Sequence, residues 1–203
     1  MILVDKDIIA AIKAGAIVIT PFTPANVGTN SYDVTLAPVL FEILPRNMFW
    51  RWVHKYFPVL TFIIRHLAYK EHDCAATEPY KTKRIEIPTS GYVLKPYVCY
   101  LGKTCEYTQT NNHVPEIQGK STLGRLFLQV HFTAGFGDVG FKGHWTLEIK
   151  ADFATRVYAG QKIGQLVFIT ASGTPNVPYN EKVTAKYNNV NGSDAMAAKG
   201  ELK

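Results

Sequence analysis

The sequence predicts a mainly β protein with a few short helices, built as a barrel, a sandwich or a jelly roll. From Ile85 onward, short apolar stretches alternate with turn residues, as in 92–102 (YVLKPYVCYLG) and 156–170 (RVYAGQKIGQLVFIT). This spacing is typical of antiparallel β architectures and differs from the alternation of strands and long helices in a doubly wound α/β domain. The 203 residues suffice for one domain, 1–203, with a substantial core.

The amino-terminal part predicts one short helix followed by two strands. Asp5 is placed to cap the helix, and Gly15 is placed to end it. Residues 16–20 (AIVIT) predict a strand, and 32–36 (YDVTL) predict another, in which apolar and polar residues alternate. Asp33 then faces away from the apolar side of its strand, where a surface carboxylate is the simplest expectation.

Two segments differ from this β pattern in composition. Residues 45–84 are aromatic and basic, and we expect an irregular insertion that packs against the body or a neighbouring subunit, with 71–84 as a loop. Residues 173–203 are polar and rich in Asn, Lys and Gly, which predicts a flexible carboxy-terminal tail. Such a tail either closes over an anionic ligand or is a disordered end.

The cysteine and charge content restrict the possible partners. The three cysteines, Cys74, Cys99 and Cys105, form no CxxC pair, so neither a zinc site nor a disulfide framework is expected. The net charge of +6 favours anionic partners. Because the lysines and arginines are scattered, a phosphorylated small molecule explains this charge equally well, and we expect no nucleic-acid partner.

The chain carries no pattern expected of an exported or membrane protein. Asp5 and Asp7 interrupt the apolar run that a signal peptide would need at the amino end. The most apolar stretch, 56–68, contains Pro58 and Arg65 and is too short to span a bilayer. We therefore expect a cytoplasmic protein without a membrane partner.

Residues 119–149 (GKSTLGRLFLQVHFTAGFGDVGFKGHWTLEI) concentrate the groups that can support chemistry. Lys120, Ser121, Thr122 and Arg125 offer cations and hydroxyls for phosphate oxygens, although a capped turn is an equally simple interpretation. The segment is not a P-loop, because the earlier glycine of GxxxxGKS/T is missing.

Glu148 is the one acid of the strand pattern WTLEI, which closes this stretch. Trp145, Leu147 and Ile149 share one face of that strand, and Glu148 lies on the other face with Thr146. In a cleft, burial would raise the pKa of the carboxyl and suit it to general acid–base chemistry. Facing water, Glu148 is simply part of a polar strand face.

Taken in order, these motifs resemble those of dCTP deaminases and bifunctional dCTP deaminase/dUTP diphosphatases, within the dUTPase-like superfamily. The core of that family has four motifs in order: a basic residue before Ser-Ser-Leu-Ala/Gly-Arg, then Val-His-x-Thr-Ala-Gly, Asp-x-Gly-Phe and Thr-Leu-Glu. Residues 119–149 of this chain are similar to all four. Outside this core, the matching segments are 5–8, 31–34, 163–166, 178–180 and 185–187. The resemblance implies a distorted β-barrel that forms a homotrimer with active sites at subunit interfaces.

The resemblance also implies residue roles. Glu148 would activate water for attack at cytosine C4 and help ammonia leave, with Ser121 and Arg125 assisting. Leu123 and Gly124 would belong to the same substrate-binding turn. The base would be contacted by Thr133, Ala134 and the backbone of Thr146 and Leu147. Asp138 would contact the sugar. The triphosphate would be bound by Lys120, Thr122, Gln165, Tyr179 and Lys186. Mg²⁺ would be held by the triphosphate, and 173–203 would act as a lid.

Two positions depart from the family pattern. The family has a glutamine four residues after the lid lysine, where this chain has Val190. The family bend Gly-Trp-Ile-Asp reads Gly-Phe-Gly-Asp here, so Gly137 removes a bulky apolar side chain beside the base pocket.

Three functions are compatible with these features. The first expectation is hydrolysis of dCTP to dUTP and ammonia, in the metabolism of pyrimidine deoxynucleotides. The alternative is the bifunctional enzyme, which continues to dUMP and diphosphate. A catalytically silent nucleotide-binding regulator is the third. Zinc deaminases carry an HxE motif with PCxxC, and this chain has neither, so deamination here would depend on a carboxylate and hydrogen-bond donors.

Overall fold

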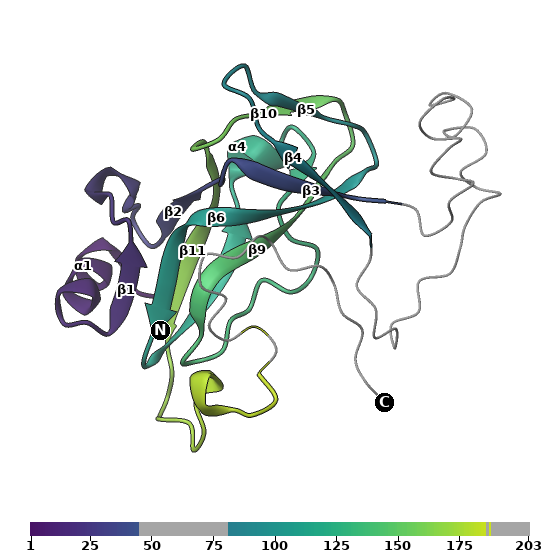
Figure 1. Ribbon diagram of the computed structural model, residues 1–203. Helices are drawn as coiled ribbons and strands as arrows, with labels where there is room; N and C mark the ends of the chain where they lie inside the picture. Colours follow the sequence, from purple (N-terminus) through teal and green to yellow (C-terminus); the bar gives the residue numbers. More distant parts are fainter. Residues whose placement is uncertain (45–80, 186, 188–203) are drawn as a thin grey trace.

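The computed structural model describes residues 1–44, 81–185 and 187, and in this part the chain is mainly β, as predicted (Figure 1). The helical elements are α1 (Asp5–Lys13), η1 (Pro24–Asn26), α4 (Ser121–Gly124) and η2 (Tyr179–Glu181). The strands are β1 (Ile17–Thr20), β2 (Tyr32–Thr35), β3 (Val39–Ile43), β4 (Thr82–Glu86), β5 (Tyr92–Leu94), β6 (Cys99–Thr110), β7 (His113–Gly119), β8 (Leu128–Gln129), β9 (Lys142–Ala151), β10 (Thr155–Val157) and β11 (Lys162–Thr170).

The described strands form three antiparallel sheets. The largest has the order β4-β3-β6-β9-β8, with β1 added to β6. A second sheet has the order β2-β11-β7, and β5 pairs with β10 in the third. Within the described residues the large sheet does not close on itself, so the strands form an open, distorted arrangement.

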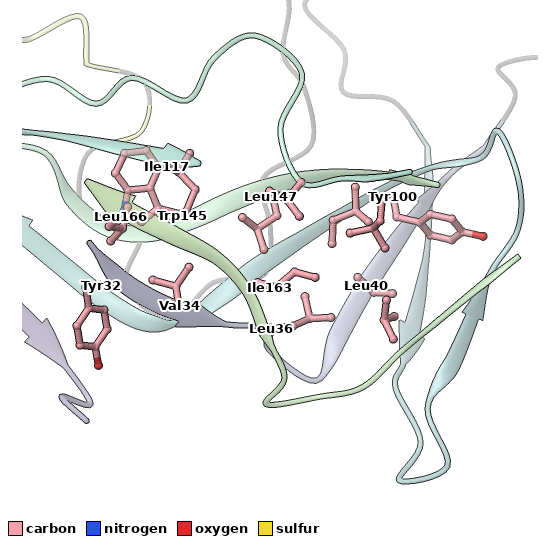
Figure 2. Packing of buried hydrophobic residues seen from close by; sticks show 14 of the residues in the cluster. Tyr32, Val34, Leu36, Leu40, Tyr100, Ile117, Trp145, Leu147, Ile163 and Leu166 are labelled. Carbon is pink, nitrogen blue, oxygen red and sulfur yellow. The ribbon is translucent and has the colours of Figure 1, made fainter. Parts of the chain in front are cut away.

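The core contains side chains from the two larger sheets. Figure 2 shows Tyr32 and Val34 of β2 gathered in one cluster with Leu40 of β3 and Leu147 of β9. The alternation predicted for β2 places Tyr32 and Val34 in this cluster, fully buried. Burial of apolar side chains from both sheets holds the sheets together.

Glu106 adds a buried polar link between the same two sheets. Its side chain, on β6, is almost fully buried. Its two carboxylate oxygens accept hydrogen bonds from the backbone N and the Oγ1 of Thr35 on β2, both at 2.8 Å. The link fixes β2, and the side chains that β2 presents, relative to the large sheet.

The structure corrects two local predictions. Val4, not Asp5, is the residue that precedes α1, and the Asp5 carboxylate accepts a hydrogen bond from Lys6 N instead of capping the helix. Gly15, with a φ of +72°, follows the helix as expected. The loop expected over 71–84 already contains the start of β4 at Thr82, because pairing with β3 supplies backbone partners that the local sequence does not reveal. Most of the 45–84 segment lies outside the described residues.

Candidate functional site

Glu148 lies on β9 between β6 and β8, on the face away from the core. Its side chain is half-buried. Its backbone N donates to Val130 O at 3.0 Å, and its Oε2 accepts a hydrogen bond from Phe132 N at 3.0 Å. No described residue donates to the second carboxylate oxygen. The backbone therefore orients the carboxylate and leaves one oxygen for a water or a ligand.

The turn at 120–125 lies at the same end of the molecule as Glu148. β7 ends at Gly119, where an added Cβ would be 3.8 Å from Cγ2 of Val130, the residue bonded to Glu148 N. α4 contacts β8, and β8 pairs with β9 at Leu128 and Ala151. The fold thus places the turn next to β8, the neighbour of the strand that carries Glu148, although turn and carboxylate are separated by more than twenty residues in the sequence.

The side chains of this turn differ in exposure. Ser121, Thr122, Gly124 and Arg125 are exposed, whereas Leu123 packs against the core and anchors the single helical turn of α4. The turn is closed by a 3.1 Å bond from Arg125 N to Ser121 O. Among the described residues no group bonds to the Ser121 hydroxyl or the Arg125 guanidinium, so both are accessible donors.

Asp33 forms an ionic cluster beside the turn. Its Oδ1 is bonded by Lys120 Nζ, and its Oδ2 lies 3.0 Å from Lys162 Nζ. The Asp33 side chain is only 17% exposed. Burial opposes its ionisation, but hydrogen bonds and charge from the two lysines outweigh burial and lower the pKa of the carboxyl. The expectation of a surface carboxylate is therefore wrong for Asp33.

Gln165 completes the cluster from β11. It lies directly opposite Asp33 in the β2–β11 pairing. Its Nε2 donates to Gly119 O at 3.0 Å, and its Oε1 accepts from Ser31 Oγ at 2.9 Å. Two of the residues expected at the triphosphate, Lys120 and Gln165, are thus neighbours.

The segment expected to form the base pocket runs from this end of the molecule toward the opposite end. Thr133 and Ala134 are exposed. Residues 135–137 extend along β7, with Ile117 N bonded to Gly135 O at 2.7 Å. The glycine-rich bend therefore includes fewer residues than the sequence indicates. Its actual turn is at 138–141, closed by Phe141 N and Asp138 O at 3.0 Å.

Thr146 and Leu147 lie on opposite faces of β9, as predicted. Thr146 is exposed on the Glu148 face, and the Leu147 side chain is fully buried in the core. The Leu147 side chain is therefore closed to a ligand, and its backbone lies opposite Gly102 in the β6–β9 pairing. Its expected role at the base stays a prediction.

The missing side chain at Gly137 leaves no empty space beside the segment expected to form the base pocket. A Cβ added at this position would lie 2.7 Å from Cη2 of Trp145 and 3.0 Å from Cγ of Pro115. The Trp145 side chain is buried, and its Nε1 donates to Thr108 Oγ1 at 3.0 Å. The indole therefore occupies the volume that the missing side chain at 137 was expected to vacate.

The described part of the tail lies against the 138–141 turn. Tyr179 N donates to Val139 O at 2.9 Å, and the Tyr179 ring lies 6.2 Å from the ring of Phe141. Lys182 Nζ is 3.8 Å from Asp138 Oδ2. The other lid positions, Lys186 and Val190, lie outside the described residues.

The expected site is divided between two ends of this chain. The 138–141 turn bonds to the end of β6, where Gly140 N donates to Thr110 O at 3.0 Å, whereas Lys120 follows the far end of β7. The seven residues of β7 span about 20 Å. Figure 1 likewise shows α4 and the yellow η2 segment at different ends. Lys120 and Gln165 are thus neighbours at one end, Glu148 lies on β9 beside β8, and Asp138 and Tyr179 lie at the other end.

Comparison with known proteins assigns this arrangement to a family. A family model described as dCTP deaminase-like matches residues 59–171, more than half of the chain. The chain belongs to the dCTP deaminase-like family. This membership confirms the family resemblance, and with it the prediction of an enzyme, a hydrolase that acts on an amidine.

Individual relatives carry a more specific name. A Clostridium acetobutylicum protein named "dCTP deaminase, dUMP-forming" is 38% identical over 176 residues, which are 87% of this chain and 84% of that protein. A Clostridium botulinum protein of the same name is 36% identical over 192 residues, 95% of this chain and 93% of that protein. These names contradict the first functional expectation, in which the reaction stops at dUTP, and they favour the dUMP-forming alternative.

A solved structure supports the fold. The 2'-deoxycytidine 5'-triphosphate deaminase from Agrobacterium tumefaciens superposes with a TM-score of 0.58 at 18% identity, over 84% of this chain and 48% of that chain. At this identity the likeness establishes the fold alone.

Neither a candidate membrane span nor a candidate metal cluster is found among the described residues. None of the helices in 1–44 and 81–185 is both long and apolar enough to cross a membrane. The same part of the chain contains no group of three or more His, Cys, Asp or Glu side chains that could hold a metal ion.

Sequence reasoning missed three groups near the candidate site. These are the ionic role of Asp33, the position of Lys162, and the Phe132 N–H that orients Glu148. The alternation of 32–36 correctly turned Asp33 away from the core, but no sequence pattern could place two lysines opposite it.

Proposed function

We propose that this protein is a bifunctional enzyme that converts dCTP and two waters to dUMP, ammonia and diphosphate. Support comes from the dUMP-forming relatives and, above all, from a carboxylate held by backbone beside the 120–125 turn. The Phe132 N–H bond to Glu148 is the observation that carries the proposal, because it directs a general base toward one position.

In the first step, Glu148 removes a proton from a water that attacks C4 of the cytosine ring. The proton then passes to the exocyclic amino group, the C4–N bond breaks, and ammonia leaves a uracil ring. Ser121 and Arg125 supply hydrogen bonds to the ring and the attacking water. In the second step, water hydrolyses the bond between the α- and β-phosphates and releases diphosphate. Thr133, Ala134 and the backbone of Thr146 and Leu147 line the base side of this site.

Lys120, Thr122 and Gln165 bind the triphosphate, accompanied by Mg²⁺. Lys120 and Gln165 are already neighbours, because Gln165 bonds to the backbone of Gly119, the residue before Lys120. Thr122 is exposed in the turn that follows. Mg²⁺ commonly keeps several waters and binds through substrate phosphates with few protein ligands. The absence of a protein ligand cluster in the described residues is compatible with an ion carried by the nucleotide. Mg²⁺ neutralises phosphate charge when it is bound.

The enzyme works as a homotrimer with its sites between subunits, in the cytoplasm. The separation of about 20 Å along β7 supports this arrangement, because the described tail residue Tyr179 lies far from Lys120 of the same chain. Asp138 and the tail residues Tyr179 and Lys186 of a neighbouring copy then close the site.

The test is to incubate the full-length protein with dCTP and Mg²⁺ and to identify the products. We expect equal amounts of ammonia and dUMP, with diphosphate and without accumulation of dUTP. Glu148→Gln should lower the rate of ammonia release by about 10²- to 10⁴-fold. Its dCTP affinity should remain, because the amide oxygen can still accept from Phe132 N. Glu86→Gln, an exposed glutamate on β4, is the matched control.

Each result is decisive for one part of the proposal. Accumulation of dUTP by the unaltered protein would exclude the dUMP-forming function. Undiminished ammonia release by Glu148→Gln would exclude the assigned general base.

A further inference from the structure

Lys162 reaches the ionic cluster because β11 begins with an irregularity. In the β2–β11 pairing, Lys162 lies opposite Thr35, and the register shifts before Gly164 pairs with Val34. In a regular strand, residues three apart point to opposite faces. The shift instead places Lys162 on the outward face with Gln165, while Ile163 and Gly164 are buried. Bulges commonly redirect side chains in this way beside functional sites.

The charge balance of the cluster depends on Lys162. Lys120 and Asp33 alone form a neutral pair, which attracts a polyphosphate only weakly. Lys162 on the second oxygen of Asp33 raises the cluster to a net charge of +1. Its side chain is 43% exposed, compared with 25% for Lys120, so it is open to a ligand.

We propose that Lys162 is a second phosphate-binding lysine and that Asp33 is the positioning residue that holds it beside Lys120. One carboxylate with an ammonium group on each oxygen fixes both cations at the rim of the nucleotide site. The ligand is the phosphate chain, and the role of Lys162 rests on the proposed function. The lowered pKa of Asp33 agrees with this assignment, because the carboxylate remains charged between its two lysines.

A purely structural role for Lys162 is the competing explanation. Its Nζ also donates to Ala25 O at 3.3 Å and so ties β11 to η1. A structural tie would affect stability without distinguishing ligands by phosphate content. Affinity for phosphate chains therefore separates the two roles.

The first experiment measures binding of inorganic triphosphate and of phosphate-free deoxycytidine to the full-length protein by calorimetry. Lys162→Met should weaken triphosphate binding about tenfold and leave deoxycytidine binding unchanged. Lys162→Arg should restore most of the affinity, because it keeps the charge. Lys13→Met, at the exposed end of α1, removes the same charge from a residue outside the cluster and should have no effect.

The second experiment uses Asp33→Asn with dCTP. The variant removes the negative charge, so we expect the KM for dCTP to stay or fall, while kcat falls about tenfold because Lys120 and Lys162 are no longer held. Retained kcat would refute the positioning role. Thermal denaturation of each variant shows whether the effect is one of stability instead.

Failure of this inference is distinguishable from failure of the proposed function. Equal triphosphate affinity of Lys162→Met and the unaltered protein would overturn the inference even if dCTP is converted to dUMP. Loss of affinity for triphosphate and deoxycytidine together would identify the structural tie and overturn it also. If dCTP is not converted, the proposed function fails, and the binding of inorganic triphosphate still decides the role of Lys162.

Discussion

At the residue scale, Gly137 and Trp145 are best understood as one unit. The family pattern has a bulky residue where this chain has Gly137, and the indole of Trp145 lies in the space that such a side chain would need. The Trp145 Nε1 bond to Thr108 keeps the ring in place. The two positions therefore compensate each other in volume, and the glycine does not by itself enlarge the base pocket.

This compensation predicts an energetic coupling between the two positions. Gly137→Ile should lower the free energy of unfolding by about 1–3 kcal/mol, because the added side chain overlaps the indole and Pro115. In a Trp145→Leu background the same change should cost at least about 1 kcal/mol less. Chemical denaturation of the unaltered protein, the two single variants and the double variant measures this double-mutant cycle. Strictly additive costs would mean that the indole does not occupy the missing volume.

At the element scale, the docking of the tail depends on the 138–141 turn. Gly140 has a φ of +90°, and an added Cβ would meet Asn180 Oδ1 at 2.5 Å and Tyr179 N at 3.0 Å. Only glycine combines this backbone conformation with such a close approach. Gly160, with a φ of +75°, has no heavy atom within 4 Å of an added Cβ. A substitution at Gly160 therefore strains the backbone without creating a steric contact.

We therefore predict that Gly140→Ala releases the tail and that Gly160→Ala does not. Both variants should lose about 1–3 kcal/mol of stability from the left-handed backbone. Only Gly140→Ala should show faster proteolytic cleavage within 173–185, because the contacts of Tyr179 and Asn180 are displaced. Limited proteolysis followed by mass spectrometry measures the difference. Equal cleavage of the two variants would contradict docking through Gly140.

At the scale of the whole molecule, β7 separates two groups of expected site residues. Lys120, Gln165 and Glu148 lie near one end of the strand, and Asp138 and Tyr179 lie near the other. A single copy with its tail in this position cannot apply both groups to one nucleotide. The proposed trimer resolves this separation by combining opposite ends of neighbouring copies.

The proposed trimer predicts complementation between two inactive variants. One variant carries Glu148→Gln, and the other lacks residues 173–203. Coexpressed, they should assemble into trimers in which an intact Glu148 meets the tail of a neighbour, and ammonia release should return. The control coexpresses Glu148→Gln with a chain that carries both changes, where no activity should return.

Light scattering measures the assembly of each mixture alongside its activity. A mixture that forms trimers without recovering ammonia release would show that the tail acts on its own chain. A protein that remains monomeric at assay concentration would exclude the trimer itself.

The sequence was informative where a local pattern has a single physical solution. Period-two alternation placed Tyr32 and Val34 in the core and Asp33 opposite them, and the strand pattern WTLEI put Glu148 on a non-core face. The cap at Asp5 and the loop over 71–84 were wrong, because helix ends and edge strands depend on neighbouring backbone as well as on propensity.

The sequence by itself determined the β class, the family motifs and the candidate acid, because each follows from residue types at fixed spacing. Only the tertiary structure decided what these residues touch. It showed Phe132 N on Glu148, two lysines on Asp33, and an indole in the space beside Gly137. Such contacts join strands far apart in the chain, and a register shift of one residue in β11 is enough to create or remove them.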